Sequence, residues 1–180
     1  MQTRSHHPPK PQIRGARPGD EQAIHGLIAE LAEFEQLTHL MQATPERLAE
    51  HLFGPRPVAE SAVAEVDGTI VAFALWFTNY STFLARPGLY LEDLYVQPPW
   101  RGRGIGRSLL IHLAALAQER GCGRFEWSVL DWNAQAIGFY ERLGATLLPD
   151  WRICRVTGES LGQLARGAPH ALTRPTGEGT

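Results

Sequence analysis

Apolar residues recur at helical spacing in four parts of the chain. In the first, Ile24, Leu27, Ile28, Leu31 and Phe34 return every three or four residues, which predicts a helix that ends near Glu35. Asp20 precedes it and is expected to cap it. Three further helices are expected over residues 44–52, opened by Thr44-Pro45-Glu46, over 105–120, stopped by Gly121, and over 133–143, stopped by Gly144.

Short alternating segments between these helices predict strands. Residues 61–66 and 69–77 flank Asp67-Gly68, a pair typical of a tight hairpin turn. Other strands are expected over residues 13–17, 89–96, 124–130 and 152–156, and a short helix to about Ala165 follows the last of them. The strand, helix, strand order over 89–130 indicates a crossover unit with parallel strands. The pattern therefore predicts a mixed sheet covered by helices.

Length and composition favour one compact domain. The 180 residues are 43% hydrophobic and 20% charged, which is ordinary for a globular protein. We expect a folded domain over residues 13–166, a disordered tail over 1–12 that includes His6 and His7, and a flexible Gly-, Pro- and Thr-rich tail over 167–180.

Charge and cysteine usage narrow the functional classes. The formal net charge of −2 argues against a nucleic-acid partner. Cys122 and Cys154 have no paired spacing, so neither a disulfide framework nor a metal site is expected, and a reducing, cytoplasmic setting fits best. No apolar run suits a signal peptide or a membrane span, so we expect no membrane partner.

A glycine-rich segment, Arg101-Gly102-Arg103-Gly104-Ile105-Gly106, lies between a predicted strand and a predicted helix. Glycines allow a tight turn, and the N-terminus of the helix favours an anion, which the arginines, Arg107 included, would also attract. The segment fits a pyrophosphate, and a plain glycine turn with surface arginines explains it equally well. A Walker loop would need a lysine before Ser108, and a dinucleotide fingerprint has a different glycine spacing and an earlier place in the domain.

The segment from Arg101 to Gly106 resembles the acyl-CoA loop of the GNAT superfamily of N-acetyltransferases, Gln/Arg-x-x-Gly-x-Gly/Ala. The texts of residues 30–35 (ELAEFE), 89–96 (LYLEDLYV), 129–133 (VLDWN), 139–140 (FY) and 143–145 (LGA) resemble one branch, the diamine acetyltransferases. That branch comprises the spermidine/spermine enzymes and their thialysine-acetylating relatives, and the resemblance covers residues 13–165.

The resemblance implies a fold, a reaction and an assembly. The fold would be a single-domain α/β (α+β) GNAT-like fold: a mixed, mostly antiparallel twisted sheet, a central parallel strand pair joined by a crossover helix, and helices on both faces. The reaction would move an acetyl group from acetyl-CoA to the primary amine of a small cationic acceptor, without a metal. The assembly would be a homodimer.

The resemblance also implies roles for individual residues. Backbone groups of Leu94, Tyr95 and Val96 would hold the acetyl and pantetheine parts. The pyrophosphate would be held by Arg101, Gly102, Arg103, Gly104, Ile105, Gly106 and Arg107. The pantetheine side would be lined by Asn133, Ala134, Gln135 and Ala136, with Tyr140 near the sulfur. The amine pocket would be lined by Phe34, Glu35, Glu92, Glu126, Trp127 and Ser128.

The chemistry of amine acetylation fits two of these residues. An alkyl ammonium, with a pKa of about 10.4, must lose a proton before its nitrogen attacks, and Glu92 is expected to take it. The phenol of Tyr140 is expected to protonate the leaving thiolate. Core packing is the alternative for Tyr140, a salt bridge for Glu92 and a solvated face for Glu35, and Asp93 is expected to be structural. Cys122 follows a helix C-terminus that disfavours a thiolate, so direct transfer in a ternary complex is expected.

The acceptor is less well defined by the sequence. The spermidine/spermine branch has Asp-Pro-Trp where this chain has Tyr80-Ser81-Thr82-Phe83. Without that aspartate, a lysine-like amino acid or short diamine is expected to outperform spermine, and Ser81→Asp should shift the preference toward spermine. Two alternatives stay open: a non-catalytic acyl-CoA-binding sensor or scaffold, and a protein N-terminal acetyltransferase.

Overall fold

The computed structural model describes residues 10–167 of the 180-residue chain. Its strands are β1 (Gln12–Gly15), β2 (Glu60–Val66), β3 (Thr69–Ser81), β4 (Arg86–Val96) and β5 (Phe125–Trp127). Its α-helices are α1 (Glu21–Phe34), α2 (Pro45–Phe53), α3 (Ile105–Glu119), α4 (Ala134–Arg142) and α5 (Gly158–Arg166). The described residues also form two short 3-10 helices, η1 (Thr38–Leu40) and η2 (Pro98–Trp100). The chain divides after Leu130 into two units, and each is described by itself.

The five strands form one sheet in the order β1-β2-β3-β4-β5. Every neighbouring pair is antiparallel except β4 and β5, which are parallel and joined by the crossover helix α3. The predicted α/β class and mixed sheet are thus confirmed. The parallel pair lies at one end of the sheet and not at its centre, because residues 152–156, predicted as a further strand, have no strand conformation.

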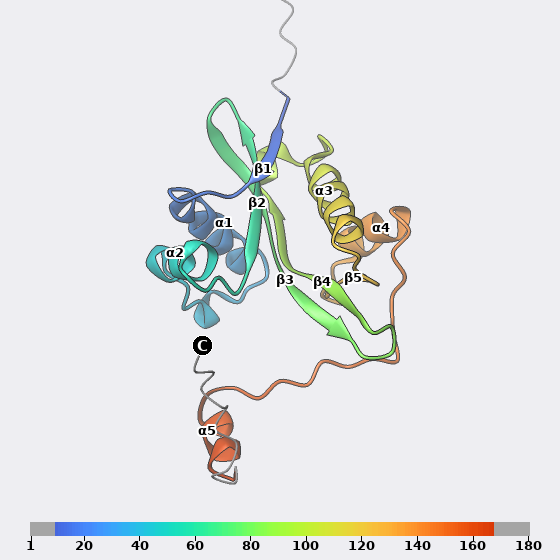
Figure 1. Ribbon diagram of the computed structural model, residues 1–180. Coiled ribbons are helices and arrows are strands. Elements are labelled where there is room, and N and C mark those ends of the chain that lie inside the picture. The colour runs from blue at the N-terminus through green and yellow to red at the C-terminus, as the bar shows by residue number, and fades with distance from the viewer. Residues whose placement is uncertain (1–9, 168–180) are drawn as a thin grey trace, which may run out of the picture. The chain divides into compact units, whose positions relative to one another are not determined.

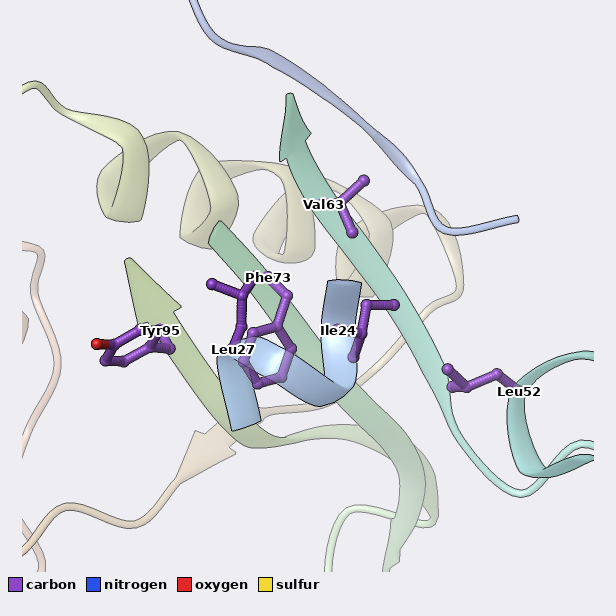
Figure 2. Close-up of a cluster of buried hydrophobic side chains, with 6 residues drawn as sticks. All are labelled: Ile24, Leu27, Leu52, Val63, Phe73 and Tyr95. Carbon is purple, nitrogen blue, oxygen red and sulfur yellow. The ribbon is translucent and has the colours of Figure 1, made fainter. Parts of the chain in front are cut away.

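The sheet is covered by helices on both faces (Figure 1). Figure 1 shows α1 and α2 on one side of the strands and α3 on the other. On the first side a buried cluster joins both helices to three strands: Ile24, Leu27, Leu52, Val63, Phe73 and Tyr95 (Figure 2). Phe73 is fully buried at its centre. This packing holds α1 over the part of the sheet where Phe73 of β3 pairs with Tyr95 of β4.

Small residues line the other face of the same strands. Ala62 pairs with Ala74 and Ala64 with Ala72, and all four are fully buried. Side chains alternate along a strand, so these alanines face away from Val63 and Phe73. The apolar stripe of α3, with Ile105, Leu109 and Leu113 fully buried, supplies the bulk on this side. α3 contacts β2, β3 and β4, and its N-terminus follows β4 in the chain by way of η2 and the glycine-rich segment.

Several local predictions were wrong in detail. The side chain of Asp20 does not cap α1, because its carboxylate binds Arg14 at 2.6 Å and the main-chain N–H of Arg17 instead. The Arg14 guanidinium lowers the pKa of Asp20. The tail predicted over 1–12 reaches too far, because Gln12 pairs with Glu65 in the sheet. The first nine residues and residues 168–180, which hold most of both predicted tails, lie outside the described residues.

The second unit has few packed residues of its own. It comprises α4, α5 and a stretch over residues 145–157 without regular structure. Ile153 and Val156 in that stretch are exposed, so the residues predicted to form a last strand have neither a strand partner nor an apolar cover. No helix in the described part of the chain is both long and apolar enough to cross a membrane.

Candidate active site

A β-bulge in β4 interrupts the pairing with β3 at the acidic pair of the sequence. Leu75 pairs with Asp93, but the next residue, Trp76, pairs with Leu91, so Glu92 is an extra residue without a partner on β3. The bulge puts Leu91 and Asp93 on opposite faces of the sheet. Leu91 is buried in the sheet, Glu92 is exposed to solvent, and Asp93 lies on the α1 face with Leu75 and Tyr95.

Beyond the bulge, the outer edge of β4 is open in the sense that no strand within residues 10–167 pairs with it. The parallel pairing with β5 stops at Leu91 and Trp127, and β5 itself ends there. The main-chain N–H of Gln97 donates to the main-chain oxygen of Val71 on β3. Because main-chain groups alternate in direction along an antiparallel strand, those of Tyr95 also face β3, whereas the main-chain groups of Leu94 and Val96 face away from it. The predicted strand over 124–130 is therefore shorter than expected. Its early end leaves the main-chain groups of Leu94 and the N–H of Val96 without a partner on β5, while the main-chain oxygen of Val96 accepts a hydrogen bond from Arg101. The predicted contacts of this segment with the acetyl and pantetheine parts stay a prediction.

The glycine-rich loop that follows β4 has the backbone that an anion site requires. Gly102 and Gly104 have φ values of 74° and 79°, in the left-handed region, and an added Cβ at either would meet nothing within 4 Å. Gly104 is the N-cap of α3, and no side chain caps the helix there. The first-turn N–H groups, including those of Ile105, Gly106 and Arg107, thus face an open glycine turn. A pyrophosphate fits this arrangement.

The side chains of the predicted cofactor residues differ in what they can contact. Ile105 is 1% exposed, so only its main-chain groups are available to a ligand. Tyr95 is 5% exposed and its main-chain groups pair with Phe73 of β3, so neither its side chain nor its main chain is available for the predicted cofactor contact. Arg103 is exposed and stacks on Trp100, with 4.7 Å between the guanidinium carbon and the ring centroid. Arg101 is directed to the end of α1, where it lies over the rings of Phe34 and Tyr95.

Three carboxylates gather where α1 ends above β4. Burial raises the pKa of Asp93 to about 6, and the negative charges of Glu92 and Glu35 add to the effect. Burial also raises the pKa of Glu35, which is the C-cap residue of α1. Within residues 10–167, none of the three forms an ion pair. A cluster of unpaired acids beside the open edge of β4 is a site that would bind a cation.

Sequence reasoning missed Asp93 as a member of this cluster. If side chains alternate strictly along the strand, Glu92 shares a face with Leu94 and Val96, and Asp93 lies on the opposite face. An acid on that face was expected to have a structural role. The sequence did contain a signal. Strict alternation would bury Asp93 on the same face as Leu89 and Leu91, and a bulge avoids this by turning Asp93 to the other face. Prediction from one strand alone cannot locate that bulge, because it depends on the register with β3.

Three residues predicted to line the amine pocket already contact other side chains of the protein: Glu126, Trp127 and Ser128. The Glu126 carboxylate lies 2.8 Å from Nε of Arg124 and accepts a hydrogen bond from Asn79 at 3.3 Å. The hydroxyl of Ser128 lies 2.8 Å from the hydroxyl of Tyr90. Trp127 stacks against Phe125 with 4.9 Å between ring centroids, on the opposite side of the strand. The uncompensated negative charge therefore lies with Glu35, Glu92 and Asp93 and not with Glu126.

The predicted role of Ser81 was wrong. Ser81 is 3% exposed, and its hydroxyl accepts the N–H of Leu84 in the turn that joins β3 to β4. An aspartate at this position would bury a charge and disrupt the turn before it could reach a substrate. Ser81→Asp is therefore not a test of acceptor preference.

The second unit carries the remaining predicted residues. The side chain of Asn133 caps α4 by accepting the N–H of Ala136 at 3.1 Å, which orders the first turn with Ala134 and Gln135. Tyr140 lies in the middle of α4, and its ring is 5.3 Å from that of Phe139. These residues occupy one short, capped helix of the second unit, and their roles toward the pantetheine chain and the sulfur stay predictions.

Gly104→Ala should raise the KM for acetyl-CoA about ten-fold, because a side chain in the left-handed region costs about 1–2 kcal/mol and the turn relaxes by moving its N–H groups. Gly121→Ala is the matched control. Gly121 has a φ of 67° beyond the other end of α3, and an added Cβ there also has open space. The control should lower the melting temperature comparably and leave the KM for acetyl-CoA unchanged. Equal effects of both variants on KM would remove the anion site from the turn.

No group of three or more His, Cys, Asp or Glu in the described residues is arranged to hold a metal ion. Cys122, half-buried, follows the C-terminal end of α3, where the helix dipole disfavours a thiolate.

Comparison with known proteins agrees with this geometry. The model of the acetyltransferase (GNAT) family matches residues 24–145. The chain is 38% identical to a thialysine N-epsilon-acetyltransferase of Mus musculus over 86% of this chain and 96% of that protein. It is 36% identical to an L-ornithine N5-acetyltransferase of Arabidopsis thaliana over 83% of this chain and 86% of that protein. Among solved structures, an integron cassette protein from the mobile metagenome of V. cholerae has a TM-score of 0.73 at 26% identity, covering 87% of this chain and 98% of its own.

Proposed function

Since the chain belongs to the GNAT family of acetyltransferases, we propose that it acetylates the primary amine of a small cationic acceptor: a lysine-like amino acid, a diamine or a polyamine. Acetyl-CoA is the donor that GNAT enzymes use. The observation that carries the proposal is the cluster of Glu35, Glu92 and Asp93, with no ion pair among the described residues, beside the open edge of β4. The similarity to enzymes named for thialysine and ornithine supports the same class of acceptor.

Asp93 is the group best suited to take the proton of the acceptor. With a pKa of about 6, it is ionised at neutral pH and is a stronger base than an ordinary carboxylate. An ammonium bound beside it would lose its proton to the Asp93 carboxylate, directly or through a water. Glu92 and Glu35 would add the negative charge that holds the cation, and Glu92 stays the alternative base.

The transfer then needs a polarised carbonyl and a protonated leaving group. An outward N–H of Leu94 or Val96 would donate to the thioester oxygen as the amine nitrogen attacks the carbonyl carbon. A C–N bond forms, the C–S bond breaks, and the sulfur leaves with the electron pair. The phenol of Tyr140 would donate a proton to that sulfur and recover one from solvent.

The proposal is tested by release of free CoA thiol with a panel of amines. Ornithine, thialysine, lysine and putrescine should give a higher kcat/KM than spermine or a peptide with a free N-terminus, because one compact acidic cluster suits a short cation. Added salt should raise the KM for these acceptors by screening the three carboxylates. No thiol release with any amine, or a strong preference for the peptide, would reject the proposal. A homodimeric assembly and a cytoplasmic location stay predictions.

A further inference from the structure

The Arg101 side chain is bound on three sides, although it opens the glycine-rich loop. Its Nε donates to the main-chain oxygen of Val96 at 2.8 Å. Its guanidinium carbon lies 5.2 Å from the ring centroid of Phe34 and 5.3 Å from that of Tyr95. Phe34 is the last residue of α1 and is 41% exposed, so Arg101 covers part of an aromatic ring that the core leaves at the surface.

A second set of contacts ties the same helix end to the same strand end. Glu30, one turn before Phe34, accepts the side-chain N–H of Gln97 at 2.7 Å. The hydroxyl of Tyr95 also interacts with Glu30, whose charge, after burial, raises the pKa of the phenol. Arg101 thus completes a network in which the end of α1 is joined to residues 95–97 at the end of β4.

We propose that Arg101 is a positioning residue that holds the last turn of α1 against β4, and that its side chain is not a ligand of the pyrophosphate. The inference rests on the proposed function in one respect: the last turn carries Phe34 and Glu35, which would form a wall of the amine site above Asp93. Loss of Arg101 should therefore weaken the acceptor site and leave the cofactor loop in place.

The neighbouring arginine shows the contrast. Arg103 lies two residues further along the same loop, between the two left-handed glycines, and its ring contact is with Trp100 of η2. Its cation stays within the loop that leads to the N-terminus of α3. Arg103 is therefore the arginine of this segment that would add charge at a pyrophosphate, and it serves as the comparison for Arg101.

The first readout is structural and needs no activity. Three amides mark the end of α1: Glu35 donates to Leu31, Gln36 to Glu33 and Leu37 to Ala32. In Arg101→Gln, hydrogen exchange of these amides should be about three- to ten-fold faster, while the amide of Ile24 in the first turn stays protected. Arg103→Gln should change neither set.

The second readout is kinetic. Arg101→Gln should raise the KM for the amine about three- to ten-fold with little change in the KM for acetyl-CoA, and Arg103→Gln should do the reverse. Arg101→Lys keeps the charge but loses the Nε donor and the planar stack, so it should resemble Arg101→Gln if both fold.

The outcomes separate the inference from the proposed function. Unchanged exchange at Glu35, Gln36 and Leu37 overturns the inference whatever the activity, and so does an Arg101→Gln enzyme whose KM rises for acetyl-CoA alone. A wild-type chain that acetylates no amine rejects the proposed function, while the exchange experiment still decides whether Arg101 holds α1.

Discussion

Replacing Asp93 with asparagine should lower kcat/KM for the amine by about 10²- to 10³-fold near neutral pH. Asparagine keeps the size and polarity of the side chain but cannot take a proton. The variant would then depend on the fraction of acceptor that is already neutral in solution. For an amine with a pKa of about 10.4, that fraction is about 10⁻³ at pH 7.4.

The pH profile distinguishes loss of a base from loss of structure. In the wild-type enzyme, kcat/KM should fall as the pH drops through about 6, because Asp93 must be ionised to accept the proton. In Asp93→Asn this decrease at acidic pH, the acid limb of the profile, should disappear. The remaining rate should rise about ten-fold per pH unit, because the concentration of the neutral amine rises by that factor.

Two further variants complete the Asp93 experiment. Asp67→Asn makes the same chemical change in the β2–β3 turn, at a φ of 48° that asparagine tolerates, and should leave the profile unchanged. Glu92→Gln should weaken binding of the cation and keep the acid limb, which should move below pH 6 because the charge of Glu92 helps to raise the pKa of Asp93. If Glu92→Gln removes the limb and Asp93→Asn keeps it, the base is Glu92, as the sequence first suggested.

Replacing Tyr140 with phenylalanine should lower the single-turnover rate about 10²-fold while the affinity for acetyl-CoA stays nearly constant. The substitution removes only the phenolic hydroxyl, so the ring contact with Phe139 is kept. Single-turnover rates are needed because slow product release can hide a change in the chemical step.

Tyr80→Phe is the matched control for the Tyr140 experiment. Tyr80 is 61% exposed near the end of β3, and losing its hydroxyl should affect neither the rate nor the melting temperature. An undiminished single-turnover rate in Tyr140→Phe would return Tyr140 to a packing role and require another proton donor for the sulfur.

Much of the fold was predictable because hydrophobic spacing records which faces are buried. The spacing of Ile24, Leu27 and Leu31 predicted α1, the apolar stripe after Gly104 predicted α3, and Asp67-Gly68 predicted the β2–β3 turn. The glycine turn before α3 was predictable too, since its left-handed backbone favours glycine wherever the loop is used.

The remaining details depend on contacts between distant parts of the chain. The bulge at Glu92 follows from the register with β3, so alternation along β4 alone could not show that Asp93 lies on the face opposite to Leu91, below the end of α1. Arg101 reads as a pyrophosphate ligand beside its glycines, but its guanidinium lies over Phe34, 67 positions earlier in the sequence. Ser81 reads as a surface residue, yet the β3–β4 turn buries it.

In the proposed reaction, the acetyl group passes directly from acetyl-CoA to a bound amine. The most direct measurement of this transfer is initial velocity over a grid of acetyl-CoA and ornithine or thialysine concentrations, with the acetylated amine and free CoA counted by mass spectrometry. We predict intersecting double-reciprocal lines and one acetylated amine per CoA released. Parallel lines with acetyl on Cys122, or CoA release without acetylated amine, would contradict it.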